Sequence, residues 1–174
     1  MRLLERKAFD QITIKEISAE AGVHNATFFR HHTDKESLLD HVAADEIDRL
    51  VAFSMQAGYG LAGYKALCEY ITEHRTLWRA LLTGGAGGAM REEYMRVSKA
   101  VAADYAETEG WLPRELGIIC STTLIVETIS WWLSQADGTY SANQIARILN
   151  ELVTSAVAGP APKVRKARRK SGGD

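Results

Sequence analysis

TIKEISAEAGVHNATFFRHHTDK, the stretch from Thr13 to Lys35, contains two short helix patterns on either side of Gly22. Thr13 and Glu16 are spaced as a capping box, in which each side chain satisfies a free backbone N–H group at a helix start. Gly22 ends this helix because glycine adopts the left-handed conformation at little cost. A second helix is expected over 25–31. Two helices joined by so tight a turn can place the second one in the major groove of DNA, so the segment predicts a DNA-binding head.

The sequence on both sides of this segment extends the helical pattern. We expect a short helix over Arg2–Ala8 before it. After it, Thr33 and Glu36 are spaced as a second capping box at the start of a long helix that ends near Gly58. Residues 1–45 are therefore predicted to form a three-helix head of the helix-turn-helix type.

The remainder of the chain is also predicted to be helical, because strand patterns are nearly absent and helix punctuation recurs. The helices are expected at about 64–74, 76–82, 89–108, 113–136 and 141–157, the last opened by a Ser141–Gln144 capping box. The fold class is thus all-α, with a larger helical domain over 46–159. Residues 160–174 hold two prolines and a basic run and are expected to be a disordered basic tail.

The charge of the chain is distributed unevenly. Six of the 21 basic residues but only one of the 22 acidic residues lie in the last fifteen positions, so the rest of the chain carries a net charge of about −6. A body this acidic is not a general binder of nucleic acid. DNA binding must therefore use a small local surface, to which a tethered basic tail can add non-specific, salt-sensitive affinity.

Other function classes find little support in the sequence. Cys68 and Cys120 lack the spacing of a metal or redox pair, which favours two buried thiols in a reducing cytoplasm. The apolar stretch from Leu116 to Leu133 is interrupted by Glu127, so it is typical of a buried helix and not of a membrane span. No nucleophile–base motif, phosphate loop, cofactor motif or metal signature is present, and we therefore expect no enzyme, no cofactor and no metal site.

The head resembles the TetR family of bacterial transcriptional regulators. The resemblance rests on four runs of residues: ITIKEI (12–17), AGV (21–23), ATFFRH (26–31) and DKESLL (34–39). It implies a homodimer that binds double-stranded operator DNA of palindromic sequence through the third helix of the head, which is the helix over 25–31. It also implies that a small-molecule effector bound in the larger domain releases the DNA, which favours a repressor over an activator. The family normally has further residues before Leu3, so we expect an upstream start.

Carried over by position, the resemblance nominates eight DNA-binding residues. Asn25 is suited to an adenine edge, and the Thr27 methyl group to a thymine methyl group. Where the family usually has Tyr, this chain has Phe29, which lacks the hydroxyl that would bond a phosphate. The full set comprises candidates for base contact (His24, Asn25, Thr27) and for backbone contact (Thr13, Lys15, Phe29, His31, Lys35).

In the larger domain, Glu127 is the most unusual residue, because it lies in the middle of an apolar helix. A carboxylate in such a place needs a partner, water or a cationic ligand group. One hypothesis places it in the effector pocket, with Trp78, Tyr105 and Trp131 as further ligand-binding candidates. The alternative, a structural glutamate or one that pairs across a dimer, is equally compatible with the sequence, and the aromatic residues also suit a core or an interface.

The last two helices predict the dimer independently of the resemblance. The helix over 113–136 is apolar almost all round, and a helix of this kind must be buried on every side. In a domain this small, burial requires a partner chain, so we expect a four-helix interface built from two helices of each subunit. The alternative function is a helical ligand-binding or adaptor protein whose head has weak or lost DNA binding.

Overall fold

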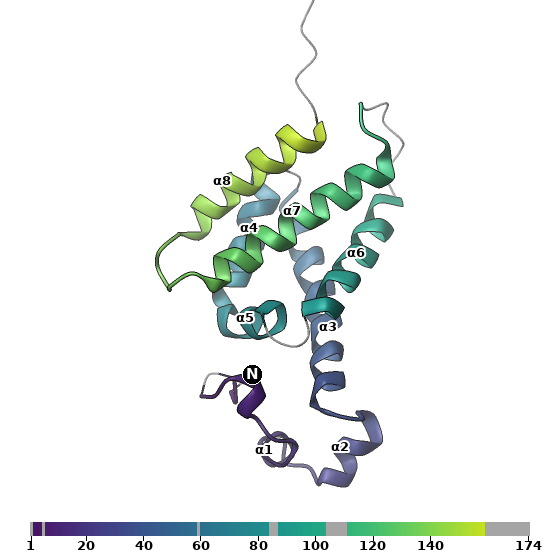
Figure 1. The fold of residues 1–174 in the computed structure, drawn as a ribbon, viewed down its shortest axis with the longest axis vertical. Coiled ribbons are helices and arrows are strands. Elements are labelled where there is room, and N and C mark those ends of the chain that lie inside the picture. Colours follow the sequence, from purple (N-terminus) through teal and green to yellow (C-terminus); the bar gives the residue numbers. More distant parts are fainter. Residues whose placement is uncertain (1, 5, 59, 84–86, 104–110, 159–174) are drawn as a thin grey trace, which may run out of the picture.

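Eight α-helices and no strand make up the part of the chain that the computed structural model describes, namely residues 2–4, 6–58, 60–83, 87–103 and 111–158 (Figure 1). The all-α prediction is confirmed. The helices are α1 (Ile14–Glu20), α2 (Asn25–His31), α3 (Lys35–Gln56), α4 (Leu61–Glu73), α5 (Arg75–Thr83), α6 (Gly87–Ala103), α7 (Arg114–Ser134) and α8 (Ala142–Val153). A short 3-10 helix (Phe9–Gln11) precedes α1, and a π-helical turn (Thr154–Ala158) follows α8. The predicted tail lies outside the described residues.

Two of the predicted capping boxes form as expected. At α1, the Thr13 side chain accepts from the Glu16 N–H group at 3.3 Å, while the Glu16 carboxylate accepts from the Thr13 N–H group at 3.0 Å. Ser141 and Gln144 make the same pair of bonds at the start of α8. Gly22 follows α1 with φ of 67°, in the left-handed region that favours glycine.

The third predicted capping box is wrong. The N-cap of α3 is Asp34, whose Oδ1 atom accepts from the Ser37 N–H group at 2.7 Å, and the Thr33 hydroxyl donates to Asp34 instead. Thr33 and Asp34 are both residue types that commonly cap the start of a helix. The carboxylate is favoured because its negative charge also interacts with the positive end of the helix dipole.

The helix expected over Arg2–Ala8 is also wrong, because the described residues of this segment form turns. Among the described residues of this segment, the Arg6 and Lys7 N–H groups both donate to the Leu3 carbonyl, at 3.1 and 3.0 Å, which closes a single turn. So short a segment does not recover the cost of helix nucleation by itself. The head therefore consists of the 3-10 helix, α1 and α2, closed by the first turns of α3.

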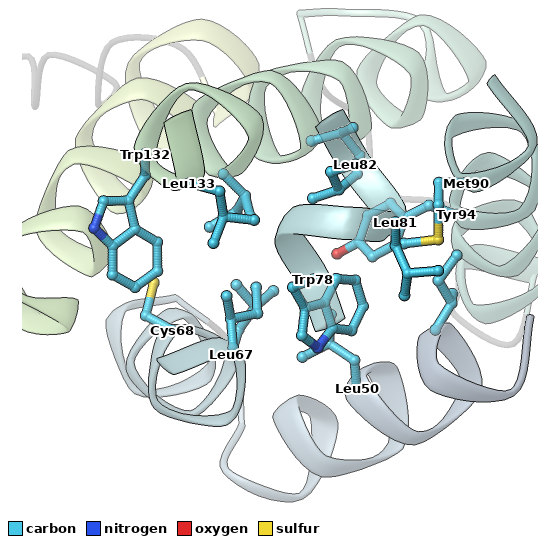
Figure 2. Close-up of a cluster of buried hydrophobic side chains, with 14 of the residues drawn as sticks. Leu50, Leu67, Cys68, Trp78, Leu81, Leu82, Met90, Tyr94, Trp132 and Leu133 are labelled. Carbon is cyan, nitrogen blue, oxygen red and sulfur yellow. The ribbon is translucent and has the colours of Figure 1, made fainter. Parts of the chain in front are cut away.

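Helix α3 connects this head to the rest of the molecule, as Figure 1 shows. Its buried residues Leu39, Ala43, Ile47 and Leu50 recur at helical spacing and belong to the same hydrophobic core as the body. The predicted domain boundary at residue 45 falls inside this helix. The core continues through side chains of α4 to α8, among them Leu67, Cys68, Trp78, Leu81, Tyr94, Trp132 and Leu133 (Figure 2).

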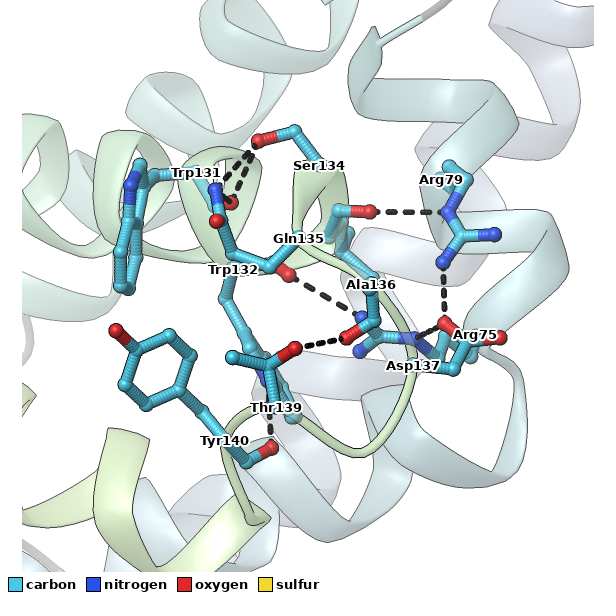
Figure 3. A network of polar contacts seen from close by, with 11 residues as sticks. Arg75, Arg79, Trp131, Trp132, Ser134, Gln135, Ala136, Asp137, Thr139 and Tyr140 are labelled. Atoms are coloured by element: carbon cyan, nitrogen blue, oxygen red, sulfur yellow. Dashed lines mark hydrogen bonds and ion pairs between the residues drawn. The ribbon is translucent and has the colours of Figure 1, made fainter.

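The body is built around α4, which packs between α3 and α8, and α6, which packs between α3 and α7. Helices α7 and α8 pack on each other and form one side of the molecule (Figure 1). Their connection is held to α5 by a polar network (Figure 3). In it, Asp137 pairs with Arg75 at 2.8 Å and with Arg79 at 2.5 Å, and both guanidinium groups also bond carbonyls at the end of α7.

The outer faces of α7 and α8 leave large apolar side chains uncovered. Leu116, Ile119 and Trp131 on α7 are 44 %, 38 % and 44 % exposed, and Ile148 and Leu152 on α8 are 37 % and 39 % exposed. By length and composition alone, α7 could cross a membrane, a test that core helices of soluble proteins also pass. Its inner face, which includes Val126, Ile129 and Trp132, is buried in the core.

Candidate DNA-binding surface and cavity

The outer face of α2 carries most of the predicted DNA-binding residues. Phe28 is 6 % exposed and anchors the helix on the head, so its neighbours point outward. His24, Asn25 and His31 are exposed, Phe29 is 56 % exposed, and Thr27 is half-buried. The structure thus brings polar side chains together at the exposed N-terminal end of a short helix, where they can reach the edges of bases in a groove.

Helix α1 and its N-cap supply two of the remaining three predicted contacts. Lys15 is exposed and forms no ion pair within the described residues. Thr13 is exposed as well, but its hydroxyl donates to the Glu16 carboxylate at 3.0 Å. Lys7 also pairs with this carboxylate and, together with the hydrogen bonds from Thr13, lowers the pKa of Glu16 to about 2. Glu16 therefore stays ionised and neutralises one lysine beside the candidate surface.

Lys35 is placed differently from the prediction. Its Nζ atom donates to the carbonyl oxygens of Phe9, Asp10 and Ile12 at 3.1, 3.0 and 3.3 Å. An ammonium group has three donors, and all three are used here. The ammonium group also lies 4.9 Å from the centre of the Phe9 ring. Lys35 thus fixes the segment before α1 to the start of α3, with no donor left for a phosphate.

Arg30 is a candidate contact that the sequence prediction missed. It is exposed on α2 and forms no ion pair within the described residues, whereas Arg2 and Arg6 pair with Glu20 at 2.7 and 3.0 Å. Its position in the second helix of the helix-turn-helix pattern could have identified it, because no acidic residue lies between Ala21 and Thr33. Arg30 and Lys15 therefore provide positive charge for phosphate contacts on this surface.

The body contains a cavity of about 1130 Å³, open to solvent, near the end of α3 that lies farthest from α2. Its walls come from α3, α4, α6, α7, the end of α8 and the turn that follows α8. Most lining residues are apolar, such as Val51, Met55, Val101, Ile118 and Ile125. The polar lining consists of hydroxyl groups (Ser54, Tyr64, Tyr94, Ser98, Ser121, Thr122, Thr154) and one charged residue, Arg114. A cavity of this size and composition suits a small organic molecule.

The predicted ligand-binding residues are not brought together at this cavity. Trp78 is 2 % exposed and lines a separate void of about 20 Å³. Glu127 lies on the surface, where it pairs with Arg91 at 2.7 Å, and this hydrogen bond lowers the pKa of its carboxyl. Trp131 is exposed and contacts the Tyr140 ring. Tyr105 lies outside the described residues. The described residues that do line the cavity are different ones, and no motif in the sequence marks them.

Comparisons with known proteins give one finding. Residues 1–42 match the family model of the bacterial regulatory proteins of the tetR family, which covers the head and the first two turns of α3. The chain matches no curated protein and no solved structure. The matched segment contains all eight predicted DNA-binding residues as well as Arg30.

Proposed function

We propose, from the premise that this chain is a DNA-binding transcriptional regulator of the TetR family, that it is a repressor released from its operator by a small molecule. In this proposal α2 enters the major groove, where His24, Asn25 and Thr27 contact bases. Lys15, Arg30 and His31 contact the phosphate backbone. Phe29 packs against sugar or backbone, because it has no hydroxyl to donate. The protein acts in the cytoplasm, where the DNA is.

The proposed regulator is a homodimer that binds a palindromic operator. Its interface is formed by the outer faces of α7 and α8, where Leu116, Ile119, Trp131, Ile148 and Leu152 are exposed. Exposed apolar side chains clustered on two adjacent helices favour burial against another surface. A second copy supplies a matching surface under two-fold symmetry, and the same symmetry relates the two halves of a palindrome.

The proposed effector site is the cavity of about 1130 Å³ in the body. Val51, Ser54 and Met55 place the end of α3 in its wall, and the same helix begins at Lys35, close in sequence to the end of α2. A ligand that prefers a different position of this wall would shift α3 and with it the spacing of the two heads. Release of DNA requires this difference in affinity between the two positions.

The observation that carries the proposal is the exposed polar face of α2 within the matched segment. We would measure binding by fluorescence anisotropy to an operator selected from random DNA and to an unrelated duplex. Asn25→Ala should weaken operator binding by about five- to one-hundred-fold and leave the unrelated duplex unaffected, because base contacts carry discrimination. Asn143→Ala, an exposed change on α8, is the matched control. Equal losses on both duplexes would contradict base contact by α2.

A further inference from the structure

Five of the seven hydroxyl groups on the wall of the cavity make no hydrogen bond within the described residues, namely those of Tyr64, Tyr94, Ser98, Thr122 and Thr154. The other two, Ser54 and Ser121, each donate at 2.8 Å to a carbonyl of their own helix. Tyr94 on α6 and Thr122 on α7 are the most buried of the five, and Tyr64 on α4 lies near Tyr94. These three groups are therefore available to something inside the cavity.

The burial of these residues makes the missing partners significant. Tyr94 is 9 % exposed and Thr122 is 3 % exposed, so only the contents of the cavity can supply the hydrogen bonds that their hydroxyls need. Thr72 and Thr83 donate to the carbonyl four residues earlier at 2.8 and 2.7 Å, but Thr122 does not. Neither the Tyr94 nor the Thr122 hydroxyl is among the fully enclosed unpartnered atoms, so each borders open space, which the cavity provides.

The charge of the site narrows the class of ligand. Burial raises the pKa of Tyr64, and burial together with the nearby Tyr64 and Cys68 side chains raises the pKa of Tyr94, so both hydroxyls are neutral donors at physiological pH. No described residue of the lining is acidic, and the one charged residue, Arg114, donates to the Ala102 carbonyl. A cation in this cavity would lose hydration, and no carboxylate among the described lining residues compensates for that loss.

We propose that Tyr64, Tyr94 and Thr122 form a recognition site for the carbonyl or hydroxyl oxygen of an uncharged and otherwise apolar effector. Such an oxygen has two lone pairs and accepts hydrogen bonds from two of these hydroxyls at a time, while the apolar skeleton lies against the aliphatic part of the wall. This inference rests on the proposed function in taking the cavity as the effector site. It adds the class of effector and the residues that distinguish it from charged molecules of the same length.

The test uses three probes of equal chain length: methyl nonyl ketone, undecanoate and undecylammonium. Binding to the full-length protein without DNA is measured by isothermal titration calorimetry. The ketone should bind more tightly than either charged probe. Tyr94→Phe and Thr122→Val should each weaken ketone binding about fivefold, the loss expected for one neutral hydrogen bond. Ser54→Ala is the matched control, because its hydroxyl lines the same cavity but already has a partner.

Stability separates recognition from a structural role. In the absence of ligand, Tyr94→Phe and Thr122→Val should not lower the thermal midpoint, since each removes a hydroxyl that has no protein partner. Ketone binding that is equal in all variants would overturn the inference, as would tighter binding of the ammonium or the carboxylate, or no binding of the ketone. Ketone binding of the expected pattern that leaves operator affinity unchanged would support the inference and contradict the proposed release by effector.

Discussion

The hydroxyl of Tyr70 donates a 2.8 Å hydrogen bond to the Oε2 atom of Glu46, a residue that is only 2 % exposed. The Oε1 atom of the same carboxylate accepts from Arg49 at 2.8 Å. Glu46 lies midway along α3, between the head and the cavity, and Tyr70 lies on α4. Burial and the bond to Glu46 raise the pKa of Tyr70 to about 12, so it remains a donor at physiological pH. This contact fixes α3 to the body.

Tyr70→Phe should therefore destabilise the protein by about 1.5–3 kcal/mol, the range for losing a hydrogen bond to a charged group. The loss arises because the buried carboxylate keeps only its bond to Arg49. Urea unfolding followed by circular dichroism measures the change. Tyr140→Phe is the control, since the Tyr140 hydroxyl makes no hydrogen bond within the described residues, and its effect should stay within about 0.5 kcal/mol. Equal effects of the two variants would contradict a special role for the Glu46 contact.

Lys35 and Arg30 should respond differently to substitution, although both are basic residues of the head. Lys35→Met leaves three carbonyls without their donor, so it should lower stability by about 1–2 kcal/mol while the salt dependence of DNA binding keeps its slope. Arg30→Ala should leave stability unchanged and reduce the slope of log K against log salt concentration by about 0.9 for each subunit, or about 1.8 for the proposed dimer, because each head loses one phosphate contact. Binding isotherms over a range of salt concentrations measure this slope for each variant. A reduced slope for Lys35→Met would refute the structural role of Lys35.

Acid should loosen the start of α1 through Glu16. The folded pKa of about 2 is below the ordinary value of 4.5, so the stabilisation is complete above pH 4.5 and is lost as the pH falls from there towards about 2. Glu16→Gln should remove this part of the acid response, while Glu36→Gln, at an exposed position of α3, should keep it. NMR titration of the side-chain carboxyl carbons in the unsubstituted protein measures the pKa of Glu16. A Glu16 midpoint near 4.5 would be the contrary result.

Leu152→Glu should separate the proposed dimer. It introduces a charge into the apolar outer face of α8, where Leu152 is 39 % exposed, and an unpaired charge at an apolar interface is strongly unfavourable. Asn143→Glu adds the same charge to α8 at a polar exposed position and serves as the control. Sedimentation velocity should give a monomer for the first variant and a dimer for the second. A dimer in both would place the interface elsewhere.

The sequence predicted the helices well where their ends carry specific chemistry. Thr13 with Glu16 and Ser141 with Gln144 marked helix starts because side-chain caps act within one turn of the chain. Prediction failed at Asp34, where two neighbouring residues both suit a cap, and over Arg2–Ala8, where a helical pattern was too short to form a helix. Local chemistry therefore determines helix ends better than it determines whether a marginal helix forms.

The candidate site was predicted in part. The residues of α2 follow one another in the chain, so their exposure could be inferred from the helix pattern around Phe28. The contacts of Lys35 could not be inferred in this way, because its partners Phe9, Asp10 and Ile12 are distant in sequence. The cavity residues are scattered over five helices, and apart from Arg114 they are mostly ordinary apolar or hydroxyl side chains. The partner of Glu127 is equally distant in sequence. The sequence therefore suggests a ligand contact for Glu127, whereas in the structure it pairs with Arg91 on the surface.

Selection of duplexes from a random pool by the purified protein, at moderate salt and followed by sequencing, tests the central claim most directly. A dimer that reads DNA through two copies of α2 should enrich a palindrome with two equal half-sites. Asn25→Ala should relax the sequence preference at the contacted positions of both half-sites. A bound pool without an enriched sequence, retained only at low salt, would contradict sequence-specific recognition and support the alternative of an adaptor with little affinity for DNA.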